Sequence, residues 1–307
     1  MSTQDFQSIV AKAMQLPGRQ AMRPVIEKEI LHYDIFAALE KNNLLTDLVF
    51  QGGTSLRLCW QSNRFSEDLD FAGGKDFSAE KLAAIKEAVE THIGKRYGLT
   101  VSVKEPKQLA DESTYDNIQV SKWQVSVETA PGRTDLPRQR IKIEIANIPA
   151  YTEEVRPVLQ NYDFLAGYGA NILVRVETLS EIMADKVLAF VASKNIRYRD
   201  IWDLAFLTQK GALLDTDLVE QKILDYGTQH YETLLAARIA ALPTIIRSKD
   251  FHDQMTRFID SATIENTLAK EGFLSYLDTT LTKIFVTMQA SLSQDPNEPS
   301  EGEIYRM

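Results

Sequence analysis

The stretch from Phe50 to Phe71 constrains the fold more than any other part of this chain. It reads as a strand, a turn, a helix and a second strand. An apolar run over 48–50 is followed by Gly52-Gly53, which permits a turn that a Cβ atom would hinder. Thr54 or Ser55 can then cap a helix that runs to about residue 61. Such a helix start presents backbone N–H groups to an anion.

Two aspartates follow this helix at the spacing of a strand. Asp68 and Asp70 alternate with Leu69 and Phe71, and because strand side chains repeat every two residues, both carboxylates project from one face. A divalent cation relieves the repulsion between two such carboxylates, and hard oxygen ligands suit Mg²⁺ or Mn²⁺ better than Zn²⁺. An anion site followed by a metal-type carboxylate pair is what a nucleoside triphosphate with its metal needs.

Each half of this pattern also has a plain structural explanation. Two glycines before a helix often form an ordinary tight turn, and acidic residues that alternate along a strand often form a solvated face. The two halves in one stretch favour the nucleotide hypothesis.

The clearest strand in the sequence covers residues 140–145, with three isoleucines on one side and Arg140, Lys142 and Glu144 on the other. Glu144 is therefore a carboxylate on a polar strand face. By itself it reads as a solvent-facing residue, and beside Asp68 and Asp70 it is also a candidate metal ligand.

The remaining periodicity predicts an α+β chain. Strands are expected at 100–104, 123–128 and 172–176, and 151–170 is expected to be an irregular connection. Helices are expected at 24–42, 78–94, 180–194, 199–210, 214–226, 231–242, 263–271 and 273–292. We expect a small mixed sheet with helices on one side, followed by an all-helical part. The expected domains are 1–176, with the N-terminal helix, and 177–292, before an acidic disordered tail over 293–307.

Composition limits the class of protein. No stretch approaches the roughly 20 apolar residues that span a bilayer, and Met1–Gln7 lacks the pattern of a signal segment, so a cytoplasmic protein is expected. The formal net charge of −9 argues against a broad surface for nucleic acid. Any RNA contact must be local. The basic candidates, which solvated surfaces also explain, are Arg133, Arg138, Arg140, Lys142, Lys194, Arg197 and Arg199.

One lysine lies on an apolar helical stripe. Lys186 falls between Ile182 and Phe190 on the helix expected over 180–194. A lysine in that position either extends to the rim of the stripe or reaches toward phosphates or the acidic cluster.

The run Gly52-Gly53-Thr54-Ser55-Leu56-Arg57-Leu58, followed by Arg64-Phe65-Ser66-Glu67-Asp68-Leu69-Asp70-Phe71, resembles the signature of the AbiEii/AbiGii-type nucleotidyltransferase toxins. These toxins belong to the DNA-polymerase-β-like nucleotidyltransferase superfamily. The similarity spans roughly residues 24 to 210, through 27–33 upstream and through 184–186 and 199–204 downstream.

The resemblance implies a polymerase-β-like mixed sheet with flanking helices and a helical C-terminal domain. It further implies transfer of a nucleotide from a nucleoside triphosphate, with Mg²⁺ or Mn²⁺, to RNA such as a tRNA 3′ end, by a toxin that has a cognate antitoxin protein. Asp68, Asp70, Lys186 and Asp200 would be catalytic, with Asp203 the weaker alternative to Asp200, and Asp68, Asp70 and Glu144 would hold metal. Gly52, Gly53, Thr54, Ser55, Arg64 and Ser66 would bind the nucleotide.

Two alternatives to this function remain open from the sequence. In one, the same residues bind a nucleotide without turnover and switch a partner interaction. In the other, the acceptor is a protein hydroxyl or a small molecule.

Overall fold

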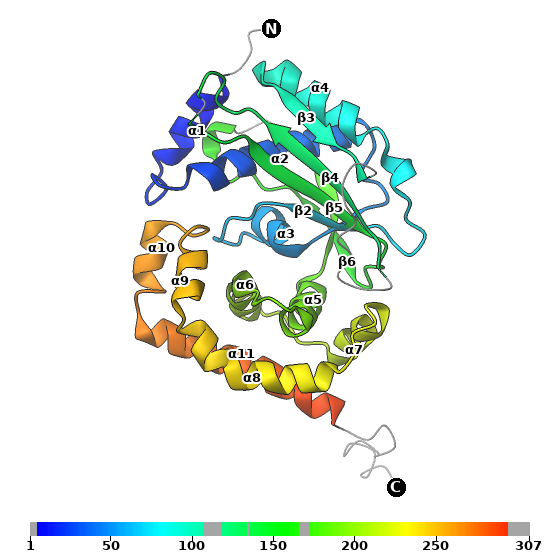
Figure 1. Cartoon of the computed structure of the whole chain (residues 1–307), viewed down its shortest axis with the longest axis vertical. Coiled ribbons are helices and arrows are strands. Elements are labelled where there is room, and N and C mark those ends of the chain that lie inside the picture. Colours follow the sequence, from blue (N-terminus) through cyan, green and yellow to red (C-terminus); the bar gives the residue numbers. More distant parts are fainter. Residues whose placement is uncertain (1–4, 107–117, 134, 166–171, 294–307) are drawn as a thin grey trace.

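The computed structural model describes residues 5–106, 118–133, 135–165 and 172–293 (Figure 1). The acidic tail and most of the polar segment over 106–117 lie outside the described residues, as do Gly167 and Gly169 of the expected irregular connection.

A seven-stranded mixed sheet forms the first part of the molecule, with strand order β3-β4-β5-β2-β1-β7-β6. β1 pairs antiparallel with β2 and parallel with β7, and β2 pairs parallel with β5. The strands are β1 (Val49–Gln51), β2 (Leu69–Ala72), β3 (Val101–Lys104), β4 (Val120–Val127), β5 (Gln139–Ala146), β6 (Glu153–Pro157) and β7 (Leu173–Glu177). The prediction of a mixed sheet with flanking helices is confirmed.

One face of this sheet is apolar and covered. Alternate residues of the central strands, such as Phe50, Phe71 and Ile143, are fully buried in a core shared with three helices. These helices are α1 (Phe6–Met14), α2 (Arg23–Lys41) and α4 (Ile85–Tyr97), and all three lie on the same side of the sheet in Figure 1. α2 has Pro24 in its first turn, where a missing N–H costs no helical hydrogen bond. The opposite face of the sheet is therefore available for polar side chains.

The second part of the chain is helical within the described residues. It comprises α5 (Leu179–Ala192), α6 (Tyr198–Gln209), α7 (Thr216–Asp225), α8 (Tyr231–Ile246), α9 (Lys249–Met255), α10 (Ser261–Asn266) and α11 (Glu271–Leu292). These helices enclose a separate apolar core, which α3 (Gly52–Cys59) joins through Leu56. In Figure 1 they lie on the side of the sheet opposite α2 and α4. The expected helical C-terminal part is confirmed, while a domain boundary at residue 176 stays a prediction.

Several expected boundaries were wrong. The segment 151–170 contains an ordered strand, β6, whose side chains are mostly exposed at the sheet edge and therefore lack the apolar alternation that marks a strand. The expected 78–94 helix is a 3₁₀ turn (Ala79–Leu82) followed by α4, which ends at Gly98 in the left-handed conformation. The short helices α1 and α9 were missed, and a further 3₁₀ turn covers Asp163–Leu165. α8 continues past Pro243 to Ile246.

In the part of the chain that the structure describes, no helix is long and apolar enough to span a membrane.

Candidate active site

A row of polar side chains crosses the face of the sheet opposite α1, α2 and α4. The β-sheet register places Gln51 opposite Asp70, Asp70 opposite Glu144, and Glu144 opposite Lys122. Residues directly opposite each other on adjacent strands share a face. The sequence therefore brings Asp70 and Glu144 together as expected, although they are far apart in the chain.

Asp68 lies one step away from this row. Its Oδ1 accepts a hydrogen bond of 2.9 Å from the Lys142 main-chain N–H, at the point where β2 begins beside β5. The three predicted carboxylates thus surround one region of the sheet face, with Asp70 in the middle.

The electrostatics of Asp70 match a cation site. Burial, with the negative charges of Glu144 and Asp68, raises the pKa of this carboxyl to about 7. A bound cation would relieve that uncompensated negative charge. As they stand, however, no three His, Cys, Asp or Glu side chains among the described residues are arranged to hold a metal ion. Glu144 instead lies 3.7 Å from Lys122 and 3.8 Å from Lys142, and would have to turn from these lysines to bind metal.

Gly52 and Gly53 are required by close contacts with this region. Gly52 has a φ of +76°, and a Cβ there would lie 2.7 Å from Asp70 Oδ2. A Cβ on Gly53 would overlap the Arg64 guanidinium and lie 3.1 Å from Ser66 Oγ. The two glycines therefore let the start of α3 approach Asp70, Arg64 and Ser66 directly.

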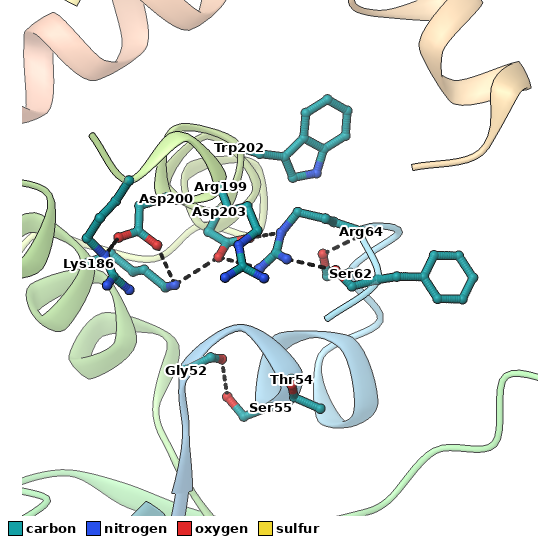
Figure 2. A network of polar contacts seen from close by, with 12 residues as sticks. Gly52, Thr54, Ser55, Ser62, Arg64, Lys186, Arg199, Asp200, Trp202 and Asp203 are labelled. Carbon is teal, nitrogen blue, oxygen red and sulfur yellow. Dashed lines mark hydrogen bonds and ion pairs between the residues drawn. The ribbon is translucent and has the colours of Figure 1, made fainter. Parts of the chain in front are cut away.

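The hydroxyls of Thr54 and Ser55 are directed to the main chain. Thr54 Oγ1 donates to the Asp68 carbonyl. Ser55 Oγ donates to the Gly52 carbonyl at 2.8 Å, as Figure 2 shows. Both residues are buried, and neither lines the cavity described below. The expectation that these hydroxyls contact the nucleotide therefore gains no support, and any binding role for them would use their backbone N–H groups.

A buried ion-pair network faces the glycines across the site (Figure 2). The Arg64 guanidinium makes two parallel hydrogen bonds to Asp203, of 2.8 and 2.7 Å. Lys186 Nζ lies 2.7 Å from Asp200 Oδ1 and 2.9 Å from Asp203 Oδ2. Arg197 binds the other oxygen of Asp200. Asp200 and Asp203, which the sequence offered as alternatives, therefore act together on Lys186.

This network keeps both aspartates ionised. Burial disfavours the charged carboxylates, but Lys186 and Arg197 outweigh it at Asp200, and Arg64 and Lys186 outweigh it at Asp203, so both pKa values lie below their usual range. Lys186 does not simply extend from an apolar stripe to solvent. It is almost fully buried, and its ammonium is held by two carboxylates at the wall of the site.

The loop before β2 is anchored from the other side by α2. Lys28 Nζ lies 2.6 Å from Glu67 Oε1, and His32 Nε2 lies 2.9 Å from the Glu67 carbonyl oxygen. Arg199 reaches the same glutamate at 3.5 Å. Glu67 thus links α2 and α6 next to the aspartates.

The carboxylates and the cations line one cavity of about 180 Å³. Its lining comprises Gly52, Gly53, Arg64, Ser66, Asp68, Asp70, Glu144, Lys186, Arg197, Arg199 and Asp200. A second cavity of about 240 Å³ shares Gly52, Asp70, Glu144, Lys186 and Arg197 with the first. It continues over a mainly apolar lining that includes Val120, Ala146, Leu188, Ala189 and Tyr226. The polar cavity suits phosphates, and its less polar neighbour suits a nucleoside.

Sequence reasoning missed Gln51 at this site. It lines the second cavity, and its Oε1 is buried without a hydrogen-bond partner within the described residues. Its position directly before Gly52 on a short apolar strand was the available signal, because it pairs opposite Asp70 once β1 and β2 are antiparallel.

A mixed sheet that carries an acidic row, with glycines that open a helix beside it, points to the nucleotidyltransferase class of proteins. Comparison of the sequence with known families identifies the group. The model of the nucleotidyl transferase AbiEii toxin family, of type IV toxin–antitoxin systems, matches residues 34–279. The chain belongs to this family, and the protein is a nucleotidyltransferase.

One solved structure shares the fold over most of the chain, and a second is similar in part. MenT4, a nucleotidyltransferase toxin from Mycobacterium tuberculosis H37Rv, is 19% identical and superposes with a TM-score of 0.58, over 95% of this chain and 91% of MenT4. JHP933 from Helicobacter pylori is 18% identical, with a TM-score of 0.46 over 87% of this chain and 93% of that protein. A search of curated proteins gave no match.

Proposed function

We propose that this toxin transfers a nucleoside monophosphate from a nucleoside triphosphate to a hydroxyl of RNA, with a tRNA 3′ end as the acceptor, and that the reaction depends on a divalent cation. One observation carries the proposal. A single cavity has Asp68, Asp70 and Glu144 on one wall and Lys186, Arg197 and Arg199 on the other. Carboxylates that hold a cation and cations that hold phosphates are the two needs of phosphoryl transfer.

Asp68, Asp70 and Glu144 would hold Mg²⁺ or Mn²⁺. A bound cation of this kind lowers the pKa of an attacking hydroxyl and neutralises charge on the phosphates. Asp70 is the central ligand in this proposal, because it lies between Gln51 and Glu144 in the sheet and closest to the start of α3. Burial, together with the negative charges of Glu144 and Asp68, raises the pKa of this carboxyl, and a bound cation would oppose that shift.

The remaining residues hold the triphosphate. The backbone N–H groups of Gly52 and Gly53 at the start of α3, with Ser66 Oγ and the Arg199 guanidinium, bind the leaving phosphates. Lys186 stabilises the charge that develops at the reacting phosphorus. Asp200 and Asp203 position Lys186, and Arg64 in turn positions Asp203. Arg64 is thus proposed as a positioning residue as well as a lining residue of the phosphate cavity.

The nucleoside occupies the second cavity in this arrangement. That cavity shares Asp70, Glu144 and Lys186 with the phosphate cavity, so a nucleotide can extend from one to the other past the catalytic residues. Family membership implies an antitoxin partner, and we propose that this partner is a separate DNA-binding protein.

The direct test is to incubate the purified protein with each of the four α-³²P-labelled nucleoside triphosphates, with a divalent cation, and with a tRNA pool or a protein extract as acceptor. Label should move to the 3′ end of RNA, with one pyrophosphate released for each nucleotide added. Label on protein alone would replace RNA by a protein acceptor. Nucleotide binding without pyrophosphate release would contradict transfer altogether.

A further inference from the structure

The face of the sheet that carries the acidic row continues beyond it over β5, β4 and β3. The register aligns Lys142 with Gln124 and Lys104, and it aligns Arg140 with Ser126 and Ser102. Residues between these positions, such as Ile141 and Val125, point into the core under the sheet. The aligned polar residues therefore form one outward face.

This face is positively charged in a protein with a net charge of −9. It carries Lys104, Lys122, Arg140 and Lys142, and Glu144 at the active site is its acidic residue within β3, β4 and β5. Lys104 and Arg140 are exposed, and neither has an ion-pair partner in the described part of the chain. Four cations on one face, two of them without an ion-pair partner among the described residues, match a polyanion.

The geometry of phosphoryl transfer indicates from which side the acceptor approaches Asp70. Gly52, at the start of the segment proposed to hold the leaving phosphates, adjoins Asp70 from the side of β1 and α3. Glu144 adjoins Asp70 from the opposite side, on β5. An in-line displacement needs the attacking hydroxyl opposite the leaving phosphates. The acceptor must therefore approach over β5, which is where the basic residues begin.

We infer that the basic sheet face, defined as Lys104, Lys122, Arg140 and Lys142, binds the phosphate backbone of the RNA acceptor and guides its 3′ end to Glu144. The inference rests on the proposed function and adds to it the docking surface of the acceptor. Adjacent strands lie about 5 Å apart, so the face extends about 10 Å from β5 to β3, enough to contact more than one phosphate.

The test is a double variant, Lys104→Glu with Arg140→Glu, compared with a control double variant, Lys12→Glu with Lys283→Glu. The control makes the same change in net charge at exposed lysines of α1 and α11. RNA binding is measured without nucleoside triphosphate, by fluorescence anisotropy of a labelled single-stranded RNA that ends as tRNA does, between 50 and 300 mM KCl, roughly the range in which counterion release is strong. Transfer to a tRNA pool is measured on the same preparations.

The sheet variant should bind RNA at least tenfold more weakly than the wild type at low salt. The slope of log affinity against log salt should fall by about 1.4, because each lost phosphate contact on single-stranded RNA contributes roughly 0.7. The control should match the wild type in both measurements. Equal affinity and slope for the sheet variant and the wild type would overturn the inference. If RNA binds through this face and no nucleotide is transferred, the docking surface stands and the proposed reaction fails.

Discussion

Lys186 combines a buried ion pair with a place in the lining of the candidate site. Its ammonium lies between Asp200 and Asp203, both buried, and it also lines the cavity that holds Asp70. The sequence indicated the unusual position of this lysine through its apolar neighbours on α5. It could not indicate the partners, because Arg64 and Asp203 are separated by 139 residues and meet only in the folded chain.

Lys186→Met should therefore lower both activity and stability. Loss of a preorganised charge at the transition state typically costs about 10²-fold in turnover. Removing one partner from a buried ion pair leaves uncompensated carboxylates, which costs about 3 kcal/mol or more in the free energy of unfolding. Turnover is measured at a temperature where the variant remains folded, and stability by urea unfolding.

The matched control is Lys222→Met. Lys222 is buried as deeply and lies 2.9 Å from Glu181 and 2.6 Å from Asp185, but it does not line the phosphate cavity. Lys222→Met should lose a similar free energy of unfolding to Lys186→Met. Its turnover, measured while the variant is folded, should fall less. Full turnover by folded Lys186→Met would remove Lys186 from the catalytic residues.

At the scale of elements, the two glycines at the start of α3 bring its backbone into contact with the Asp70 carboxylate. The two glycines and the aspartates could be predicted from their spacing, because strand and helix periodicities place them on one side. The sequence pattern could not show where the Thr54 and Ser55 hydroxyls point. In the folded chain they donate to the carbonyls of residues 68 and 52. The exposed edge strand β6 was missed because it lacks a buried face.

Gly52→Ala should lower nucleotide transfer, and backbone strain alone should not account for this loss. Both Gly52 and Gly74 have positive φ, of +76° and +80°. An L-residue in this conformation costs about 1 kcal/mol. A Cβ at Gly74 meets nothing within 4 Å, whereas a Cβ at Gly52 meets Asp70 at 2.7 Å.

Gly74→Ala is thus the control for strain alone. Both variants should lose a similar free energy of unfolding from the backbone, and Gly52→Ala alone should also lose nucleotide transfer as Asp70 is displaced. Comparable transfer by the two variants, measured with the same tRNA and nucleotide, would argue that the contact with Asp70 has no catalytic consequence.

At the scale of the whole molecule, the site lies between two apolar cores, one shared by the sheet with α1, α2 and α4, and the other enclosed by the C-terminal helices. Composition and periodicity predicted the mixed sheet and the helical C-terminal part. They could not predict how Arg64, which precedes β2, binds α6, nor how the sheet register aligns Gln51 with Asp70, because such contacts depend on tertiary packing rather than on local pattern.

A buried carboxyl that lines neither cavity of the site should govern part of the pH dependence of stability. Burial raises the pKa of Asp34 from 3.8 to about 7, against the opposing effects of Arg96 and Tyr97. His92 Nε2 also lies 3.8 Å from Asp34 Oδ1. Between these two pKa values the folded protein binds more protons than the unfolded chain, so its stability falls as pH rises.

Asp34→Asn removes this titration. The variant should gain stability relative to the wild type as pH rises from about 4 to 7, by at most roughly 4 kcal/mol. Urea unfolding of both proteins at several pH values measures the difference. A constant difference across this window would show that Asp34 titrates near its ordinary pKa.

The most direct measurement of the central claim is transfer of labelled nucleotide to tRNA by the wild type and by Asp70→Asn, each with and without a divalent cation. Asparagine keeps the size of the side chain and removes the charge that would hold the cation. The wild type should transfer nucleotide only when the cation is present, and Asp70→Asn should lose at least about 10²-fold in rate while its melting temperature stays within a few degrees or rises. Transfer by Asp70→Asn at the wild-type rate, or by the wild type in excess chelator, would contradict the account.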